Sequence, residues 1–337
     1  MGKKVTMQDI ADALQVSVVT VSNALSNKEG VGKELRYKIR ETAIAMGYPY
    51  HSDIKPRNKK ISYNAGVIMA ECFFSDNAFY SLLYEKLLLE FEKVNYSCIL
   101  EVISYEDEIR GILPHMILEN EIDGIVVLGQ ISRSYIDMLV IEDIPYIFLD
   151  FYDEHYSVDS IVSDSVCGSY LLTNHLIENG YRKIGYVGNL KATSSILDRY
   201  LGYYKALFQN GIKLRQDWVI SDRDQDGNFI LPIELPEELP EAFVCNCDAI
   251  AFFLMEQLKE AGYRIPEDIA IVGYDDSAFA KMCNPQLTTF RINQEMMVEV
   301  AVDIFIKRIR YENYYGGRTV IGGRVVIRDS VMLSGKK

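Results

Sequence analysis

Residues 5–25 read VTMQDIADALQVSVVTVSNAL, and this stretch decides how the N-terminal part of the chain folds. Thr6, followed three residues later by Asp9, is a capping-box-like start for a helix. Apolar residues at positions 7, 10, 11 and 14 then recur at helical spacing. Ser17 is a good N-cap for a second helix, and only two residues separate it from the first. Two helices joined so closely predict a helix-turn-helix.

A third helix is expected after Gly32, with Gly47 as its C-cap. The apolar positions of the second and third helices are Val18, Val21, Ala24, Leu25, Leu35, Ile39, Ala43 and Met46. The second helix leaves Thr20, Ser22 and Asn23 on its other side. Short polar side chains and valine methyls can meet base edges and phosphates in a major groove, and an asparagine suits adenine. Any three-helix unit can show this spacing, however, so spacing alone leaves DNA binding open.

The charge of the chain is divided unevenly. The 337 residues have a formal net charge of −13, yet residues 1–60 hold eleven Lys or Arg against six Asp or Glu, a local charge of +5. The remaining residues hold 24 against 42, a charge of −18. A small basic unit on an acidic body can neutralise phosphates locally while the body stays off the duplex. The charge pattern therefore favours a nucleic-acid partner for the N-terminal unit.

Composition excludes several classes of protein. A chain of this length suggests two or three globular units. No apolar run approaches the roughly 18 residues needed to span a bilayer, and the polar N-terminus lacks the apolar core of a secretory signal. We therefore expect a cytoplasmic protein without a membrane partner. The six cysteines, at 72, 98, 167, 245, 247 and 283, are scattered, which predicts reduced thiols and no disulfide framework.

Sites for a metal or for catalysis are not expected either. Cys245 and Cys247 form a close pair, but the four histidines, at 51, 115, 155 and 175, show no paired ligand spacing. No glycine-rich phosphate loop precedes a helix, and no Gly-x-Ser-x-Gly sequence is present. The sequence predicts a protein that is not an enzyme and holds no metal or cofactor.

From residue 61 onward, short apolar runs alternate with amphipathic stretches. Strand candidates are 65–69, 97–103, 124–128, 146–149, 160–162, 183–187, 242–245, 269–273 and 325–333. Helix candidates are 78–94, 167–179, 199–210, 249–261 and 294–311. Such alternation predicts parallel α/β sheets. This many strands suit two stacked doubly wound subdomains, with a ligand held between them at the carboxyl ends of the strands.

The run from Val5 to Tyr48 resembles the head of the lactose repressor family of bacterial regulators. In that family V-T-x-x-D-[VI]-A-x-x-x-x-V-S-x-x-T-V-S introduces the DNA-reading helix. The resemblance implies base-reading positions for Val18, Val19 and Asn23, and positions closer to phosphates for Thr6, Ser17, Thr20, Ser22 and Asn27. Gln15 stands where the family usually has glycine in the turn, and Asn23 where arginine is common. Guanine recognition by an arginine is therefore not expected at that position.

Residues 49–64 carry Lys55, Arg57, Lys59 and Lys60 and too few apolar positions for a core element, so they are expected to form a basic linker. In the family the linker becomes a hinge helix on DNA, whose leucine enters the minor groove. Here Arg57 stands at the leucine position and follows Pro56, which disfavours a helix interior. Arg57 and Lys59 are predicted to meet DNA phosphates or a narrow groove. A solvated flexible tether is the alternative.

Motifs in the larger part extend the resemblance over nearly the whole chain. They are Asp164–Gly168 (like D-N-x-x-G), HLIENGYRKIGYVG at 175–188, Arg199–Tyr203 (like R-x-x-G-[FWY]) and IPEDIAIVGYDDSAFAKMCNPQLTT at 265–289. The resemblance implies an N-terminal all-α helix-turn-helix domain followed by an α/β, two-lobed, periplasmic-binding-protein-like domain with two doubly wound parallel sheets. A cleft between lobes that hinge is a sensor geometry.

The resemblance also implies the ligand contacts. Arg199 should clamp ligand oxygens, Asp275 should accept from ligand hydroxyls, and Asp248 should lie beside them. Phe74 or Phe79, with its neighbour Tyr80, could stack on a sugar ring.

Three positions keep alternatives open. Asp164 is placed among the effector contacts, although it is equally suited to cap the helix that begins near Cys167. For Asp276, a role in holding the strand-to-loop turn is the alternative to a ligand contact, which leaves Asp275 as the predicted ligand contact. Cys247 stands where the family usually has an asparagine beside Asp248, which puts the usual ligand in doubt.

The sequence thus predicts a DNA-binding domain at 1–48, the linker at 49–64 and an effector-binding domain at 65–337. One subdomain should comprise 65–159 and 292–322, the other 160–291 and 323–337. The predicted function is a homodimeric transcription regulator, a repressor, that binds operator DNA under control of a small polar effector such as a sugar. A solute-binding or sugar-processing protein on the same scaffold is the alternative, but it does not explain the basic N-terminal unit.

Overall fold

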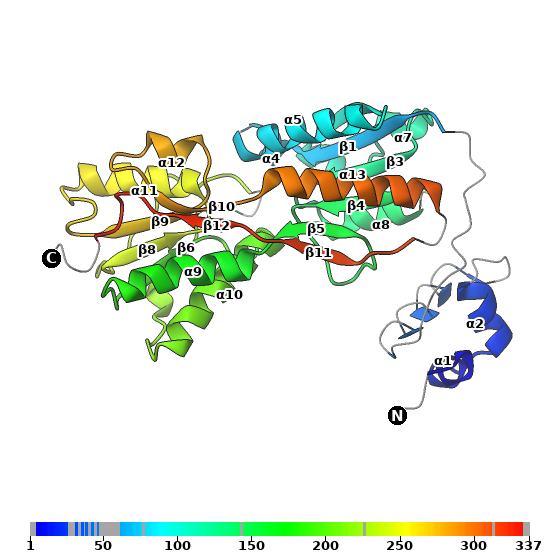
Figure 1. The fold of residues 1–337 in the computed structure, drawn as a ribbon, viewed down its shortest axis with the longest axis horizontal. Helices are drawn as coiled ribbons and strands as arrows, with labels where there is room; N and C mark the ends of the chain where they lie inside the picture. Colours follow the sequence, from blue (N-terminus) through cyan, green and yellow to red (C-terminus); the bar gives the residue numbers. More distant parts are fainter. Residues whose placement is uncertain are drawn as a thin grey trace.

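The structure, a computed structural model, describes residues 5–25, 31–32, 35–36, 38–39, 42–43, 46, 61–75, 78–141, 144–224, 227–311 and 314–332. Figure 1 shows a group of N-terminal helices and a larger body in which two α/β lobes lie end to end. The fold class predicted from the sequence is confirmed.

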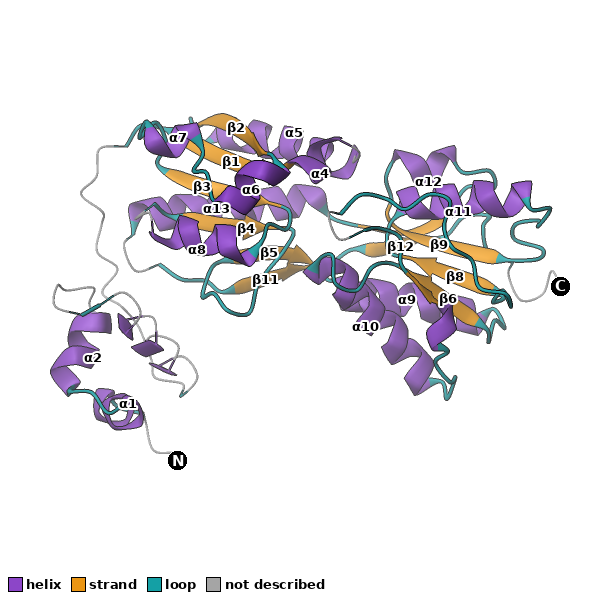
Figure 2. Cartoon of the chain, turned by 180° about the vertical axis from the view of Figure 1, so that it is seen from behind, coloured by secondary structure: helices purple, strands orange, loops and turns teal. Residues whose placement is uncertain are grey.

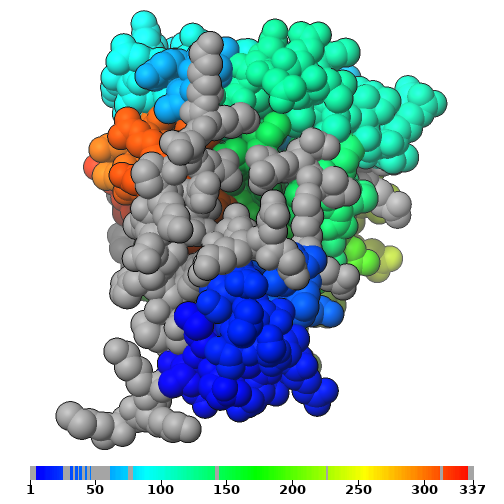
Figure 3. All heavy atoms as spheres, turned by 90° about the vertical axis from the view of Figure 1, so that its right-hand side faces the viewer, coloured from blue at the N-terminus to red at the C-terminus, as the bar shows by residue number. Residues whose placement is uncertain are grey.

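The N-terminal unit begins with α1 (Met7–Leu14) and α2 (Val18–Leu25). The predicted capping box is present, with reciprocal hydrogen bonds between Thr6 and Asp9. Gln15 ends α1 in the left-handed conformation with φ 54°, which costs a non-glycine residue about 1 kcal/mol. The described residues 35, 36, 38, 39, 42 and 43 are helical. The core of this unit is formed by Ile10, Ala11, Val21, Ala24, Leu25, Ile39 and Ala43. Figure 3 shows the described N-terminal residues in dark blue as a compact unit.

The first lobe contains a six-stranded sheet in the order β11-β5-β4-β3-β1-β2, with every pair of neighbours parallel. Its strands are β1 (Asn64–Ala70), β2 (Ser97–Ile103), β3 (Gly124–Leu128), β4 (Tyr146–Leu149), β5 (Ser160–Ser163) and β11 (Arg318–Ile321). Its helices are α4 (Glu71–Ser75), α5 (Ala78–Lys93), α6 (Tyr105–Arg110), α7 (His115–Leu118), α8 (Arg133–Ile141) and α13 (Gln294–Arg310). Figure 2 shows these helices on both faces of the sheet. Burial on both faces explains the almost continuous apolar runs of β1 and β3.

The second lobe contains a sheet in the order β12-β10-β9-β8-β6-β7, parallel except for β12, which runs antiparallel to β10. Its strands are β6 (Ile184–Val187), β7 (Val219–Ile220), β8 (Ala242–Cys245), β9 (Ala270–Asp275), β10 (Thr288–Arg291) and β12 (Arg324–Val326). Its helices are α9 (Ser165–Glu178), α10 (Ser194–Gln209), the 3-10 turn η1 (Gln216–Trp218), α11 (Asp248–Glu260) and α12 (Ala278–Met282). α9 and α10 pack closely at Gly202, where a Cβ would lie 2.2 Å from the carbonyl oxygen of Val166.

The chain crosses between the lobes three times, after β5, after β10 and after β11. One crossing is fixed by the main chain of Asp164, whose N–H donates to the carbonyl of Ile321 (2.9 Å) and whose carbonyl accepts from the hydroxyl of Tyr274 (3.3 Å). Three crossings at one place allow the lobes to move relative to each other about a short hinge.

Some predicted elements differ from the observed ones. Residues 160–163 were predicted to open the second subdomain, yet they form β5 in the first sheet, because β5 pairs with both β4 and β11. The strand predicted at 325–333 ends at residue 326. Beyond it Ser330 is fixed by side-chain hydrogen bonds to Thr288 and Ile271 instead of by a strand ladder. The helix predicted at 199–210 begins at Ser194, because Thr193 caps it.

Candidate functional site

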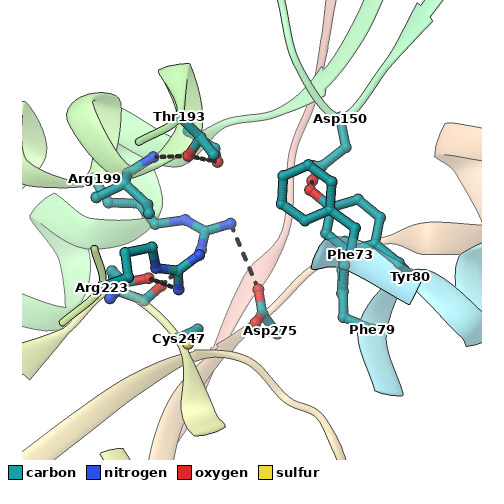
Figure 4. A pocket seen from close by; sticks show the side chains of 12 residues that line it. Phe73, Phe79, Tyr80, Asp150, Thr193, Arg199, Arg223, Cys247 and Asp275 are labelled. Atoms are coloured by element: carbon teal, nitrogen blue, oxygen red, sulfur yellow. Dashed lines mark hydrogen bonds and ion pairs between the residues drawn. The ribbon is translucent and has the colours of Figure 1, made fainter. Parts of the chain in front are cut away.

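A cavity lies between the lobes, at the carboxyl ends of the strands. Its lining residues are Phe73, Phe79, Tyr80, Asp150, Thr193, Ser195, Ile196, Arg199, Arg223, Asn246, Cys247 and Asp275. Figure 4 shows the aromatic side chains and Asp150 of the first lobe facing Arg199, Arg223 and Asp275 of the second. A cavity that both lobes complete can be sensitive to their relative position.

Arg199 and Asp275 form the charged centre of the second-lobe wall, as the sequence predicted. The Nη2 atom of Arg199 lies 3.5 Å from Oδ1 of Asp275, which makes an ion pair but leaves the contact long for a hydrogen bond. The Nη1 atom of Arg199 donates to the carbonyl of Asn246 (2.6 Å), and its guanidinium carbon lies 3.9 Å from the centroid of the Tyr274 ring. Its Nε is buried without an acceptor in the described part of the chain. Burial raises the pKa of Asp275 well above its ordinary value, against the lowering effect of Arg199.

Asp150 provides a second carboxylate, from the first lobe. It directly follows β4, is almost fully buried, and adopts a left-handed backbone with φ 69°. The Tyr80 hydroxyl donates to its Oδ2 at 2.8 Å. Burial raises the pKa of Asp150 to about 6, although Arg199 and the Tyr80 hydrogen bond both act to lower it. The sequence analysis missed Asp150, although a carboxylate placed directly after a predicted strand was a signal for it.

Arg223 is the second cation of the cavity, and the sequence analysis missed it as well. Its Nε donates to Asp222 Oδ2 (3.1 Å), and its Nη2 lies 3.0 Å from the same oxygen. The side chain of Asn246 also donates to Asp222 Oδ2 (2.7 Å) and to the carbonyl of Val187 (3.0 Å). Arg223 is thus held rigidly and its charge is balanced inside the protein. It lies in an irregular stretch after β7, where no local sequence pattern marks it.

Three residues predicted to contact the effector do not line this cavity. Asp248 is fully buried and accepts from the Thr289 hydroxyl (2.6 Å) and the Ser277 N–H (2.7 Å), so it holds the loop after β9. Asp164 caps α9 by accepting from the N–H of Cys167 (3.1 Å), the alternative that the sequence left open. Phe74 is half exposed, whereas its neighbour Phe73 and the predicted Phe79 line the cavity.

Asp276 holds a turn, as the sequence suggested, and Cys247 lies at the cavity wall. Asp276 forms ion pairs with Arg291 and Arg328, and therefore holds the strand-to-loop turn rather than the cavity. Cys247 lies at the cavity wall in place of the family's asparagine, and burial raises the pKa of its thiol to about 12. A neutral thiol donates only weak hydrogen bonds, so Cys247 offers a ligand weaker hydrogen bonding than the amide of an asparagine would.

Further contacts bridge the lobes beside the cavity. The Tyr152 hydroxyl in the first lobe donates to the carboxylate of Asp198 on α10, at 3.0 and 3.1 Å. The side-chain oxygen of Gln130 accepts from the N–H and hydroxyl of Ser194 at 3.2 and 3.3 Å. These bonds connect the two lobes directly beside the cavity.

The predicted DNA-reading helix has the exposure that reading requires. Val19 is 67% exposed, and Val18, Thr20, Ser22 and Asn23 are partly exposed on α2. Ser17 caps α2 by accepting from the N–H of Thr20 at 3.0 Å. The apolar side of α2 is buried against α1 and the third helical segment. The predicted contacts Asn27, Arg57 and Lys59, and Pro56 in the linker, lie outside the described residues.

Comparison with known protein families identifies both parts of the chain. Residues 6–49 match the family described as bacterial regulatory proteins, lacI family. Residues 173–331 match the periplasmic binding protein-like domain. The chain belongs to the lacI family of bacterial regulatory proteins. It is a DNA-binding transcription repressor and not an enzyme, as the sequence predicted.

Full-length relatives and solved structures agree with the lacI family assignment. The ribose operon repressor of Haemophilus influenzae is 26% identical over 330 residues, covering 97% of this chain and 98% of the relative. The PurR repressor of Photobacterium profundum is 25% identical, with the same coverage of both chains.

Two solved structures share the fold. One is a complex of the regulator CelR with cellobiose, with TM-score 0.68, 21% identity, and coverage of 97% of this chain and 100% of that one. The other is a lac repressor dimer bound to operator and an anti-inducer, with TM-score 0.66, 20% identity, and coverage of 98% and 100%. Among the described residues, no helix is long and apolar enough to cross a membrane.

Proposed function

We propose that this repressor binds a near-palindromic operator as a homodimer, and that a small polar effector in the cavity between the lobes controls the binding. The observation that carries the proposal is the cavity itself, because Asp150 from one lobe faces Arg199 and Asp275 from the other. A ligand that contacts both walls stabilises one arrangement of the lobes. Its affinity must then differ between the two DNA-affinity states, and DNA must change ligand affinity by the same factor.

The chemistry of the walls favours a polyhydroxylated, uncharged ligand such as a sugar. Asp150 and Asp275 can accept from hydroxyl groups, while the free Nε of Arg199 can donate to a ligand oxygen. The aromatic rings of Phe73 and Phe79 offer apolar surface from the opposite wall. The names of the ribose operon repressor and the cellobiose complex agree with a sugar, and purines are a second class to test.

A thermal-shift screen of sugars, nucleosides and their phosphates tests the effector site. A ligand that binds only the folded state raises the free energy of unfolding, by about 2.7 kcal/mol at a hundredfold excess over its Kd, and so raises the melting temperature. We expect a hit whose effect disappears in Asp275→Asn and persists in Asp164→Asn, because an asparagine at 164 still caps α9. A ligand whose thermal shift persists in Asp275→Asn would have to bind outside the proposed cavity. A ligand that binds in the cavity but leaves operator affinity unchanged would contradict the proposed control of DNA binding.

The pattern of protection on operator DNA tests whether the protein binds as a homodimer. One recognition helix reads only a few base pairs, so two heads related by a two-fold axis are expected to protect two half-sites. Footprinting should show two symmetric half-sites, and binding should weaken steeply with salt. Specific binding by a monomer, or a footprint without two-fold symmetry, would contradict the proposal.

The DNA-reading role of Asn23 makes a separate prediction. Asn23→Ala is expected to cost about 1–3 kcal/mol at one base-pair position per half-site, because a bidentate contact to adenine is lost. Lys59→Ala, which removes a proposed phosphate contact, should weaken binding to all sequences alike. Binding is measured on an operator library and on random DNA. If Asn23→Ala lowered the affinity for operator and for random DNA equally, Asn23 would not read a base.

A further inference from the structure

Helix α10 carries an uninterrupted row of exposed apolar side chains. Its inner side is buried in the second lobe through Ile196, Arg199, Gly202, Tyr203, Ala206 and Leu207. On its outer side Leu197, Leu201, Tyr204 and Phe208 are exposed by 40, 44, 42 and 71%. Figures 1 and 2 both show α10 at the outer edge of the second lobe. Exposed apolar residues that are scattered singly are ordinary, but a contiguous row on one helix indicates an interaction surface.

The spacing of this row is that of a coiled-coil seam. The four positions follow one another at intervals of 4, 3 and 4 residues, which is the heptad pattern of alternating a and d positions. The rings of Tyr204 and Phe208 lie 6.3 Å apart, and Tyr200 stacks on Tyr204 at 6.4 Å. The seam is therefore a continuous apolar surface, shaped to receive another helix.

We propose that α10 pairs in antiparallel orientation with α10 of a second copy of this chain. In this arrangement Leu201 of one copy faces Tyr204 of the other, and Leu197 faces Phe208. All four side chains find partners under a single two-fold axis, which is the self-complementarity that an isologous interface requires.

The charges beside the seam select the antiparallel direction. Asp198 and Lys205 each follow a seam residue directly, so both lie on the same flank of it. Antiparallel pairing places Asp198 of each copy opposite Lys205 of the other, whereas parallel pairing would place the uncharged Tyr200 opposite Lys205 and the uncharged Thr193 opposite Asp198. Asp198 already accepts from Tyr152, but a carboxylate can accept further bonds.

The seam is short, which sets the expected strength of the contact. Stable interfaces bury about 800 Å² per partner from 20–30 residues a side, far more than four seam residues provide. The contact should therefore be weak and depend on concentration. The four seam residues belong neither to α2 nor to the cavity lining, and in the proposed arrangement the contact would join two operator-binding dimers.

Sedimentation velocity on the full chain tests the pairing. We expect a concentration-dependent step to a species of twice the mass, whose midpoint moves to at least about tenfold higher concentration in Phe208→Glu. Lys205→Glu should weaken the step and Lys205→Arg should preserve it. Gln209→Glu is the matched control, because it adds the same charge one residue away from the seam. A step absent from the native chain, or unchanged by Phe208→Glu, would overturn the proposal.

Disulfide cross-linking tests the direction without depending on charge. In a Cys167→Ser background, which removes the exposed native thiol of α9, the double variant Leu201→Cys/Tyr204→Cys should form cross-linked chains readily on oxidation. The matched pair Leu197→Cys/Tyr204→Cys should not, because those positions are not opposite in the antiparallel register. Efficient cross-linking of Leu201→Cys with itself would instead indicate parallel helices and would overturn the proposed geometry.

Discussion

Arg199→Ala is expected to lower the free energy of unfolding by about 3–5 kcal/mol and to abolish the response to effector. Arg199 is almost fully buried beside Asp275, and Asp150 also lies within reach of its charge. Removing one member of a buried pair leaves the other charge without compensation, which is more costly than the net contribution of the pair. Urea unfolding monitored by circular dichroism measures the change, and titration with an identified effector measures the lost response.

A double-mutant cycle separates this explanation from simple loss of packing. Asp275→Asn removes the uncompensated carboxylate, so the double variant with Arg199→Ala should recover part of the stability lost by Arg199→Ala alone. Lys205→Ala, which removes an exposed cation from the same helix, should change stability by no more than about 0.5 kcal/mol. Additive losses from the two cavity substitutions would show that their charges do not interact.

The sequence was informative about the fold wherever burial fixed the composition of an element. β1, β3 and β8 are buried along nearly their whole length, and their apolar runs were recognised within one or two residues. β10 and β11 were not predicted, because Thr288–Arg291 and Arg318–Ile321 mix threonine and arginine with apolar residues. Such strands are fixed by pairing with a neighbour already in place, a tertiary effect that local patterns do not contain.

The site residues, like the strands, could be predicted from the sequence only in part. Arg199 and Asp275 were predicted from motifs and do meet at the cavity. Asp248 was predicted from the same family resemblance, yet it serves the structure by holding Thr289 and Ser277. Arg223 was not predictable, because only the fold brings it from the stretch after β7 to the cavity wall. Proximity in a motif therefore identified the region of the site but did not separate ligand contacts from structural ones.

The route from the cavity to the N-terminal unit runs through the first lobe. Asp123, which directly precedes β3, accepts from the N–H and hydroxyl of Ser62 and from the N–H of Tyr63 at 2.8–2.9 Å. These bonds attach the end of the linker to the sheet whose strand β4 leads into Asp150. A movement of the first lobe on ligand binding would therefore be transmitted to the end of the linker, which offers a physical connection between the two functions.

The pH dependence of stability should report on Asp150. Burial raises its pKa from an ordinary value near 3.8 to about 6. Between about pH 4 and pH 6 the folded chain therefore holds a proton that the unfolded chain has released. The free energy of unfolding must then fall as the pH rises through this window, and the loss is complete above pH 6.

Asp150→Asn is expected to stabilise the protein by about 3 kcal/mol at pH 7.5 and to have almost no effect at pH 4, because asparagine cannot ionise. Asparagine tolerates the left-handed backbone at this position and can still accept from Tyr80. Effector affinity should fall at the same time, since the carboxylate is lost. Asp153→Asn is the control of opposite sign: burial acts to raise the pKa of Asp153, but hydrogen bonds from His155 and Arg133 outweigh it and lower the pKa. That variant should lose stability at neutral pH, and a parallel pH profile for the two variants would contradict the assignment.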